Sequence, residues 1–555
     1  MNYLQENIHH LSSILSHLGV EDAIISPGSR NAPMIVALAR NPHIHCHSIV
    51  DERSAGFVGL GMAKANSKPV VLCCTSGTAL LNYYPAIAEA FYSGVPLIVL
   101  SADRPPELID NWDGQCIRQE MVFDNHIVAN YSIPSYADKE DCLEEIEEII
   151  QAAMQDAIFM QGPVHINAPM REPLYGEIPE GFSFKKGEVI IPIRAKSHLD
   201  LNLDGYTKIL VLNGAEYKKN SALALALNKI ITNNKAVVLN DIISNQNEET
   251  LKGYDALLLK ADSNDYAPEV LITTGKFVLS KSLKTYLRKY KPKKHIHLCE
   301  IKENIGDPFD SEPQIIEGGL AENLEKITQK TTNSSDYISY WLSQNKKHEI
   351  KQNSFFQEEN YAEFKACFTI ANSIKKESII HLANSTTVRY FSYLKSFLDN
   401  NEIHANRGTS GIDGCSSTVV GFALASSKER ITQPEKEHIL ITGDVAFFYD
   451  INALWNNKLP KNLKIILLNN GGGGIFRYIN GPNKLGELEE FFETAHNRTA
   501  ENTAKEFGIE YLHSHDQNSL ITALQNFYNN KNRVILEVFT DKYKNEIQFN
   551  KFKEL

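Results

Sequence analysis

The chain has 555 residues, of which 43% are hydrophobic and 22% are charged, and 56 basic against 68 acidic side chains give it a net charge of −12. A chain of this length is expected to form about three domains, because single hydrophobic cores rarely extend beyond roughly 250–300 residues. The acidic balance, without a long basic run, argues against nucleic acid as a partner.

The opening residues and the cysteines indicate a cytoplasmic protein. The opening MNYLQENIHH lacks a cationic region followed by an apolar core, so no signal peptide is expected. No apolar run approaches the roughly 20 residues that a membrane span needs. The eight cysteines are scattered without zinc spacing, and we expect reduced thiols rather than a disulfide framework.

Short apolar runs alternate with helical patterns in the first third of the chain. The expected strands are residues 23–26, 45–50, 70–74 and 96–100, and the expected helices are residues 32–40, 54–66, 79–92 and 139–157. This alternation is typical of a parallel α/β sheet. The unit is expected to close near residues 163–169.

The rest of the chain repeats this alternation twice. A polar stretch at residues 185–204 is expected to be a linker, and a second linker with some helix is expected at residues 330–353. The expected strands between and after them are residues 209–212, 236–239, 270–274, 295–298, 379–383, 438–442, 464–468 and 533–540. The fingerprint GxGxxG is absent, so no bound NAD or FAD is expected. We predict three doubly wound parallel α/β domains, at residues 1–182, 183–335 and 350–555.

One stretch of the last third, Gly443 to Phe476, combines polar residues that suit a metal and a diphosphate. Its two strands end in Gly443-Asp444 and in Asn469-Asn470. Consecutive parallel strands present their carboxyl ends at one edge, so Asp444 and Asn470 should lie side by side there. A carboxylate and an amide oxygen suit Mg²⁺, and the four glycines that follow let a diphosphate approach the backbone. Helix capping or ordinary turn chemistry explains either piece alone, but not both together.

This stretch resembles the diphosphate- and magnesium-binding signature of the thiamine-diphosphate enzymes. The resemblance implies three metal ligands, which are Asp444, the Asn470 side chain and the carbonyl of Gly472, around Mg²⁺ or Mn²⁺. It implies that the cofactor also contacts Gly443, Val445, Gly473, Ile475 and Phe476. Val445 stands where the family usually has glycine. For Ile475 and Phe476, a plain core role is an equally open alternative to a wall over the cofactor.

Glu52 lies where an expected strand gives way to a helix, in the sequence Val50-Asp51-Glu52-Arg53. An acidic residue there can simply stabilise the helix start. In the family, a glutamate at this junction hydrogen-bonds the aminopyrimidine ring and so promotes removal of the thiazolium proton. The resemblance therefore implies that Glu52 is catalytic and that the first domain binds the pyrimidine.

Four arginines, Arg30, Arg104, Arg389 and Arg407, lie at or near the carboxyl ends of expected strands. Ligands of α/β sheets bind at that edge, and several guanidinium groups together indicate a substrate with several carboxylates. The motifs SPGSRNAP, DERSAGF, SADRPPELID, NRGTSGIDG and NNGGGGIF are similar to one branch of the family, which serves menaquinone biosynthesis.

That branch implies that 2-oxoglutarate loses carbon dioxide and that the remaining succinyl unit adds to isochorismate in a 1,4-addition. By position, isochorismate would be held by Ser29, Arg30, Arg104 and Gln115, with Arg407 beside them. Ser385 and Arg389 would hold the distal carboxylate of the succinyl unit. In the central domain the family often has a Lys-Arg pair where this chain has Lys276-Phe277, so either Lys276 or Lys281 would reach isochorismate, unless both are only solvated.

Two other functions stay open at this point. Another carboligase of the same cofactor class, such as an acetohydroxyacid synthase, would act on smaller 2-oxo acids and would not need four arginines. A non-catalytic protein with this fold would be expected to have lost at least one of Glu52, Asp444 and Asn470. Because the family's active site lies between the first domain of one subunit and the last domain of another, we expect a homodimer or a homotetramer.

Overall fold

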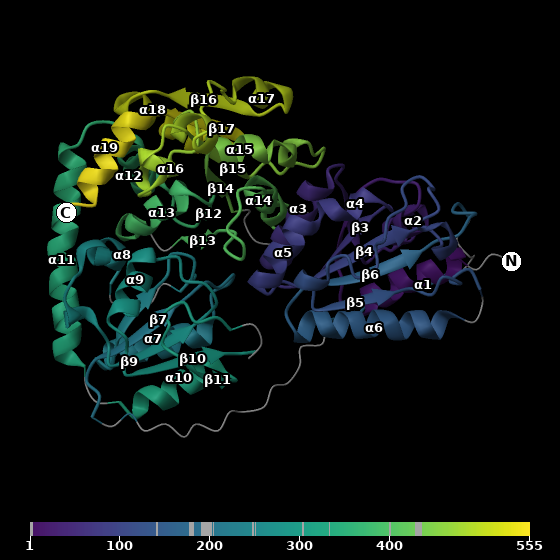
Figure 1. The fold of residues 1–555 in the computed structure, drawn as a ribbon, viewed down its shortest axis with the longest axis horizontal. Coiled ribbons are helices and arrows are strands. Elements are labelled where there is room, and N and C mark those ends of the chain that lie inside the picture. The colour runs from purple at the N-terminus through teal and green to yellow at the C-terminus, as the bar shows by residue number, and fades with distance from the viewer. Residues whose placement is uncertain are drawn as a thin grey trace. The chain divides into compact units, whose positions relative to one another are not determined.

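Three sheets, each built only from parallel strand pairs, organise the described part of the chain (Figure 1). The computed structural model describes residues 4–139, 142–176, 182–189, 203, 205–246, 249, 251–301, 305–331, 334–398, 401–427 and 436–555. The parallel pairing confirms the predicted α/β class.

The first sheet has the strand order β2-β1-β3-β4-β6-β5. Its strands are β1 (Asp22–Ile25), β2 (His45–Ser48), β3 (Val70–Cys74), β4 (Leu97–Asp103), β5 (Ala129–Ser132) and β6 (Val164–Pro169). The accompanying helices are α1 (Leu4–His17), α2 (Ala32–Arg40), α3 (Glu52–Asn66), α4 (Thr78–Asn82), α5 (Tyr84–Ser93) and α6 (Leu143–Phe159). The strand order changes direction between β1 and β3, because β2 lies on one side of β1 and the later strands on the other.

The second sheet has the order β11-β10-β9-β7-β8. Its strands are β7 (Ile209–Asn213), β8 (Val237–Asn240), β9 (Val270–Thr274), β10 (Lys294–Cys299) and β11 (Gln314–Glu317), and its helices are α7 (Ser221–Thr232), α8 (Tyr254–Leu257), α9 (Lys281–Lys289) and α10 (Leu320–Gln329). Alternate residues of β7 enter two separate cores, Ile209 and Val211 on one face and Leu210 and Leu212 on the other. Both faces are therefore covered, as a doubly wound sheet requires.

The third sheet has the order β13-β12-β14-β15-β17-β16. Its strands are β12 (Ile379–Leu382), β13 (Glu402–His404), β14 (His438–Gly443), β15 (Leu463–Asn469), β16 (Glu510–Ser514) and β17 (Val534–Phe539). The helices after residue 334 are α11 (Ser335–Glu358), α12 (Glu363–Ser373), α13 (Thr386–Tyr393), α14 (Cys415–Ala425), α15 (Asp444–Tyr449), α16 (Ile475–Tyr478), α17 (Glu501–Glu506), α18 (Gln517–Asn529) and α19 (Lys542–Phe552). Here the direction changes between β12 and β14.

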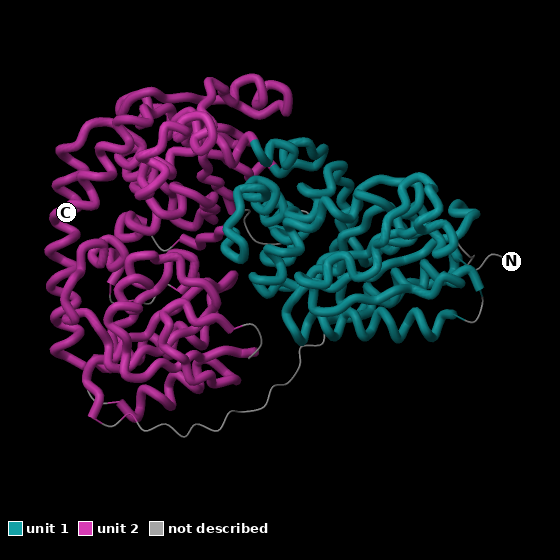
Figure 2. Tube along the Cα trace, viewed as in Figure 1, with its two compact units in different colours: residues 1–193, 406–435, 449–460 teal, residues 194–405, 436–448, 461–555 magenta. Residues whose placement is uncertain are grey.

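The chain folds into two compact units (Figure 2). Unit 1 is Met1–Ile193, Asn406–Glu435 and Tyr449–Pro460, and unit 2 is Arg194–Ala405, Lys436–Phe448 and Lys461–Leu555. Within unit 1, α14 packs closely on α3, since a Cβ added at Gly61 or at Gly421 would collide with the backbone of the other helix. The three domain ranges proposed from the sequence stay a prediction.

Three of the predicted elements differ from the structure or lie largely outside the described residues. For residues 330–353 the sequence predicts a linker with some helix. The helix is confirmed, but the linker is wrong, because α11 is a 24-residue helix that is buried through Tyr337, Ile338 and Trp341. The helix expected at residues 79–92 is two helices, which meet at Tyr83. Most of the linker expected at residues 185–204 lies outside the described residues. In the described parts of the chain, no helix is both long and apolar enough to cross a membrane.

Candidate active site

Several of the predicted site residues follow strands at which a sheet order changes direction. Ser29 and Arg30 come after β1, Lys276 after β9, Ser385 after β12, and Asp444 after β14. Open α/β sheets bind ligands outside the carboxyl ends of the strands at these positions. In each of the three sheets, the edge that the topology predicts to bind a ligand is therefore the edge at which the motifs placed these residues.

In unit 2, Asp444 and Asn470 lie side by side, as predicted. The backbone amide of Asn470 donates to Asp444 Oδ2 at 3.2 Å, and the amides of Gly471 and Gly472 donate to the same oxygen at 2.8 and 3.0 Å. Asp444 Oδ1 accepts from the Val445 amide at 2.7 Å. Burial raises the pKa of Asp444, while the nearby His496 and these amides act in the opposite sense.

The polar atoms here fit a divalent cation and a diphosphate. Asn470 Oδ1 is buried and has no hydrogen-bond partner among the described residues, whereas Asn470 Nδ2 donates to Glu363 Oε2 at 2.6 Å. An orphaned buried oxygen beside a carboxylate is what a hard cation requires. Gly472 has φ +156°, and a Cβ there would lie 2.7 Å from the carbonyl oxygen of Glu493, so only glycine fits this turn.

The other residues predicted to contact the cofactor surround this loop. Gly443 ends β14, and a Cβ added there would meet nothing within 4 Å. The Gly473 amide donates to the Glu493 carbonyl at 2.7 Å. Ile475 and Phe476 begin α16 and are only half-buried, and the Phe476 ring packs against Phe492 at 5.5 Å between centroids. Partial exposure leaves both side chains available to a ligand.

In unit 1, Glu52 is the first residue of α3, but it is not the helix cap. The Asp51 carboxylate accepts from the amides of Arg53 and Ser54, and it also accepts from Asn452 Nδ2 at 2.7 Å. Glu52 is half-buried, and burial raises its pKa, with a smaller contribution from the charge of Asp51. The capping explanation therefore applies to Asp51 and leaves Glu52 free for another role.

Arg30 and Arg104 come together in unit 1. Arg30 is buried, donates to the Met170 carbonyl at 3.0 Å and pairs with Glu172 at 3.4 Å. Its pKa is lowered first by burial and then by the charge of Arg104. The guanidinium of Arg104 donates to the Gly114 carbonyl at 2.9 Å, and its Nε is buried without a hydrogen-bond partner among the residues that the structure describes. Arg104 also lies 3.9 Å from the Asp113 carboxylate. The two guanidinium groups lie close enough for their charges to interact, and such groups suit a ligand with carboxylates.

Two further predicted residues lie exposed in unit 1. Ser29 Oγ is 3.3 Å from the Tyr175 hydroxyl. Gln115 has φ +56°, and its backbone passes so close to Gly77 that a Cβ on that glycine would lie 3.2 Å from the Gln115 Cα. The loop that carries Gln115 therefore touches the turn after β3.

The segment that carries Arg407 also belongs to unit 1. The buried carboxylate of Glu89 accepts from the amides of Gly408 at 2.9 Å and Thr409 at 2.7 Å. Lys64, also buried, forms an ion pair with Glu89 at 3.6 Å. Arg407 itself is half-buried. Glu89 thus fixes the two residues that follow Arg407.

Ser385 and Arg389 come together as predicted. Ser385 precedes α13, and the Arg389 guanidinium donates to the Ser385 carbonyl. The Ser385 hydroxyl does not cap the helix, and the residue has φ +78°. Strained backbone of this kind concentrates at functional sites.

Lys276 lies exposed after β9, and Lys281 starts α9. Burial raises the pKa of the nearby Glu216 to about 7, Glu300 adds to the rise, and Lys276 opposes it. Lys276 therefore lies close enough to Glu216 for the two charges to interact.

Three residues in contact with the predicted site escaped the sequence reasoning. Glu363 bonds Asn470, His496 Nε2 lies 3.6 Å from Asp444, and Glu89 holds the loop after Arg407. Each lies far along the chain from its partner, so no local motif marks it.

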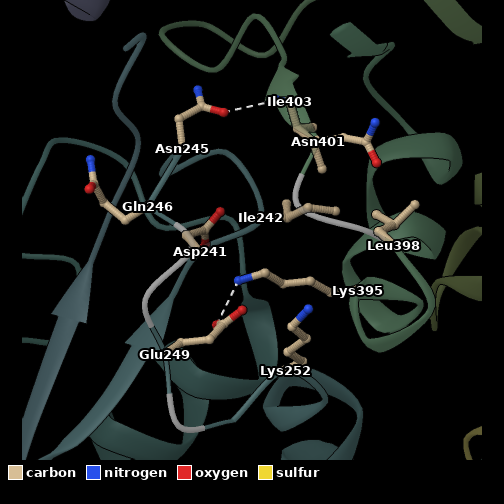
Figure 3. Close-up of a pocket in the computed structure, with 10 residues that line it drawn as sticks. All are labelled: Asp241, Ile242, Asn245, Gln246, Glu249, Lys252, Lys395, Leu398, Asn401 and Ile403. Atoms are coloured by element: carbon tan, nitrogen blue, oxygen red, sulfur yellow. Dashed lines mark hydrogen bonds and ion pairs between the residues drawn. The ribbon is translucent and has the colours of Figure 1, made fainter. Parts of the chain in front are cut away.

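A small polar pocket lies in unit 2 (Figure 3). It is lined by Asp241, Ile242, Asn245, Gln246, Glu249, Lys252, Lys395, Leu398, Asn401 and Ile403. Lys395 pairs with Glu249 at 2.9 Å, and Asn245 Oδ1 accepts from the Ile403 amide at 2.8 Å. No predicted site residue lines it, and its central charges, on Lys395 and Glu249, pair with each other, so we interpret it as a packing junction.

Comparison with known proteins agrees with this site. The N-terminal TPP binding domain of thiamine pyrophosphate enzymes matches residues 8–125, and the C-terminal TPP binding domain matches residues 388–538. The 2-succinyl-5-enolpyruvyl-6-hydroxy-3-cyclohexene-1-carboxylate synthase of Flavobacterium johnsoniae is 40% identical over 98% of this chain and 97% of its own length.

Two further synthases of that name are similar to the same extent. The protein of Flavobacterium psychrophilum is 39% identical over 97% of this chain and 96% of its own length. The protein of Cytophaga hutchinsonii is 39% identical over 99% of this chain and 98% of its own length. The chain therefore belongs to the 2-succinyl-5-enolpyruvyl-6-hydroxy-3-cyclohexene-1-carboxylate synthase family of thiamine-diphosphate enzymes.

Proposed function

We propose that the chain is a thiamine-diphosphate-dependent transferase of menaquinone biosynthesis. It decarboxylates 2-oxoglutarate and adds the succinyl unit to isochorismate in a 1,4-addition, which gives 2-succinyl-5-enolpyruvyl-6-hydroxy-3-cyclohexene-1-carboxylate. The observation that carries the choice of acceptor is the buried Arg30 beside Arg104. Two adjacent cations match a substrate with two carboxylates, and a site for small 2-oxo acids alone would not need them.

The residues of unit 2 would hold the diphosphate through a divalent cation. Asp444, Asn470 Oδ1 and the carbonyl of Gly472 would bind Mg²⁺ or Mn²⁺, both of which accept oxygen ligands. The glycines after Asn470 let the diphosphate approach the backbone. Gly443, Val445, Gly473, Ile475 and Phe476 would complete the surroundings of the cofactor. When bound, thiamine diphosphate would supply a nucleophilic carbon for the 2-oxo group and a cationic thiazolium ring that can accept the electron pair released on decarboxylation.

Glu52 would hold a proton for the aminopyrimidine ring. A carboxyl group with a raised pKa shares a proton with a ring nitrogen more readily than a solvated one. Because Asp51 caps the helix, the Glu52 carboxyl group is available for this role.

The substrate-binding residues would divide the two reactants between them. Isochorismate would contact Ser29, Arg30, Arg104, Gln115 and Arg407, with Lys276 from the central sheet. Ser385 and Arg389 would bind the distal carboxylate of 2-oxoglutarate. These groups orient the reactants and keep water from the reacting carbon.

The proposal also covers the oligomeric state of the protein and its location in the cell. In the family the active site lies between subunits, so we propose a homodimer or a homotetramer that works in the cytoplasm. Size-exclusion chromatography with light scattering measures the assembly, and a purely monomeric active enzyme would contradict it.

A substrate comparison tests the proposed reaction. Carbon dioxide release is measured from 2-oxoglutarate and from pyruvate, with thiamine diphosphate and Mg²⁺, each with and without isochorismate. We expect release from 2-oxoglutarate and a product with the mass of the isochorismate adduct. Equal turnover of pyruvate, or an isochorismate that stays unchanged, would contradict the assignment. Omission of thiamine diphosphate is the control and should abolish release.

A further inference from the structure

The side chain of Asn470 poses a problem of orientation. An asparagine amide has an oxygen and a nitrogen of nearly equal size, and only the oxygen can bind a cation. A rotation of half a turn about the last side-chain bond would present the NH₂ group instead and repel the metal. Some neighbouring group must therefore decide which end faces the cation.

Glu363 is placed to fix the orientation of the Asn470 side-chain amide. Asn470 Nδ2 donates to Glu363 Oε2 at 2.6 Å, while Asn470 Oδ1 is buried and unpartnered among the described residues. Two further donors, Thr540 Oγ1 at 3.4 Å and Asn545 Nδ2 at 3.5 Å, approach the same glutamate oxygen. Three donors around one oxygen hold it as an acceptor. A reversed amide would place its oxygen against Oε2 and lose the hydrogen bond.

The glutamate itself is held rigidly. Its side chain belongs to a residue that is only 1% exposed, at the first position of α12. The Glu363 amide donates to Asn545 Oδ1 at 2.8 Å, which anchors the start of the helix to α19. Because this acceptor is fixed, it also fixes the orientation of the Asn470 amide that donates to it.

We propose that Glu363 is a positioning residue for the divalent cation: it holds Asn470 Nδ2 and thereby leaves Asn470 Oδ1 to the metal. The inference rests on the proposed function, which places the cation at Asp444 and Asn470. In this role Glu363 acts through Asn470, whose amide occupies Glu363 Oε2, and not as a ligand of the cation.

Four variants test this role by the affinity for Mn²⁺, measured by electron paramagnetic resonance in the presence of thiamine diphosphate. Glu363→Ala frees the amide to turn, and the affinity should fall about 10- to 100-fold. Asn470→Asp should also weaken binding, because two carboxyl groups then meet at hydrogen-bond distance. The double variant should bind more tightly than either single variant, since an aspartate presents an oxygen in both orientations. Glu363→Gln keeps an acceptor and should lose less than Glu363→Ala.

Recovery of Mn²⁺ affinity in the double variant would distinguish a positioning role of Glu363 from a structural role. If Glu363 merely stabilised α12, the two losses would multiply, and that result would overturn the inference. Unchanged Mn²⁺ affinity in Glu363→Ala would overturn it as well. Glu359→Ala is the matched control, because its carboxylate pairs with Lys551 at 2.9 Å rather than with Asn470, and it should bind Mn²⁺ normally.

Asp444→Ala distinguishes failure of the inference from failure of the proposed function. If Asp444→Ala weakens Mn²⁺ binding and Glu363→Ala does not, only the inference is wrong. If Asp444→Ala leaves the affinity unchanged, the cation binds elsewhere, and the proposed cofactor site fails together with the inference.

Discussion

The Asp51 carboxylate accepts the backbone amide of Arg53 at 2.9 Å, which makes Asp51 the cap of α3 and leaves Glu52 outside the cap. We therefore predict separate effects for the two neighbours. Glu52→Gln keeps the shape and removes the charge, so thiamine diphosphate should still bind. Exchange of its thiazolium proton, followed by NMR after acid quenching, should slow by about 100-fold or more, as loss of acid–base assistance does.

The control for this prediction is Asp51→Ala. Loss of the cap should lower the free energy of unfolding by about 1 kcal/mol, whereas Glu52→Gln should leave it nearly unchanged. A Glu52→Gln enzyme that exchanges the proton at the normal rate would return Glu52 to a structural role.

A second prediction concerns the buried pair of Glu89 and Lys64, which lies beneath the loop of Arg407. Glu89→Gln weakens the acceptor of the Gly408 and Thr409 amides and removes the negative charge of the buried ion pair with Lys64. Breaking a buried pair in this way should cost about 3–5 kcal/mol of stability. Because the loop loosens, the KM for isochorismate should rise, while the KM for 2-oxoglutarate should not.

The double variant Glu89→Gln with Lys64→Met separates the two effects. Removal of the Lys64 ammonium should restore most of the stability, because the buried positive charge is then removed together with its countercharge. The KM for isochorismate should stay raised, since the loop still lacks its carboxylate. Recovery of both quantities together would show that Glu89 has no specific effect on the loop.

The strands could be predicted because parallel sheets are buried on both faces and their strands read as short apolar runs. Residues 70–74 and 270–274 coincide with β3 and β9. Helix α11 could not be predicted in the same way. Its apolar anchors Tyr337, Ile338 and Trp341 lie in its first two turns, and a long polar stretch follows that resembles a linker.

The site was predictable wherever the topology alone decides the neighbours. Asp444 and Asn470 follow strands that pair in parallel, so their proximity follows from the sheet. Glu363 and Glu89 were missed because their partners lie 107 and 319 residues away in the chain. Contacts of that range arise from helix packing, for which no local spacing is diagnostic.

A third prediction follows from the buried His165 in unit 1. The ring bonds Ser101 Oγ at 2.8 Å and Asn130 Oδ1 at 2.9 Å, and burial lowers the pKa of His165 to about 3. The unfolded chain, with a pKa near 6.5, binds the proton more tightly. Stability that is present above about pH 6.5 is therefore lost as the pH falls toward 3. Between pH 7 and pH 4.5 the loss should be about 2–3 kcal/mol.

Urea unfolding at the two pH values measures this loss. His165→Gln cannot take up the proton, so its stability should fall less over the same interval. His513→Gln, on the exposed side of β16, is the control and should behave like the unmodified chain. Equal pH dependence in all three proteins would contradict the prediction.

A fourth prediction concerns Lys276, the one cation at the position where the family often has a Lys-Arg pair. Lys276→Ala should raise the KM for isochorismate roughly 10-fold or more, as loss of a charged hydrogen bond does, without an effect on the KM for 2-oxoglutarate. Lys281→Ala is the matched variant, because Lys281 is the first residue of α9, the next helix along the chain. If only Lys281→Ala raises the KM, the contact belongs to that residue, and if neither does, this loop does not reach the substrate.

The last prediction asks which reactant Ser385 and Arg389 bind. Of the two substrates, only 2-oxoglutarate carries a carboxylate at the far end of a flexible chain. Arg389→Ala should therefore cost the decarboxylation of 2-oxoglutarate about 2–4 kcal/mol, as truncation of one partner of a desolvated charge pair does. Pyruvate has no distal carboxylate, so its turnover should change much less. Equal losses on the two acids would identify Arg389 as a structural residue.

Ser385→Gly separates the hydroxyl from the backbone at the same site. Ser385 has φ +78°, a conformation that glycine adopts at little cost, so the substitution should stabilise the fold by about 1 kcal/mol. It also deletes the hydroxyl, so the KM for 2-oxoglutarate should rise although the protein is more stable. Such opposite changes are expected only if the strained residue serves the substrate. A more stable enzyme with an unchanged KM would mean that the backbone turn, and not the Ser385 hydroxyl, is what the site requires.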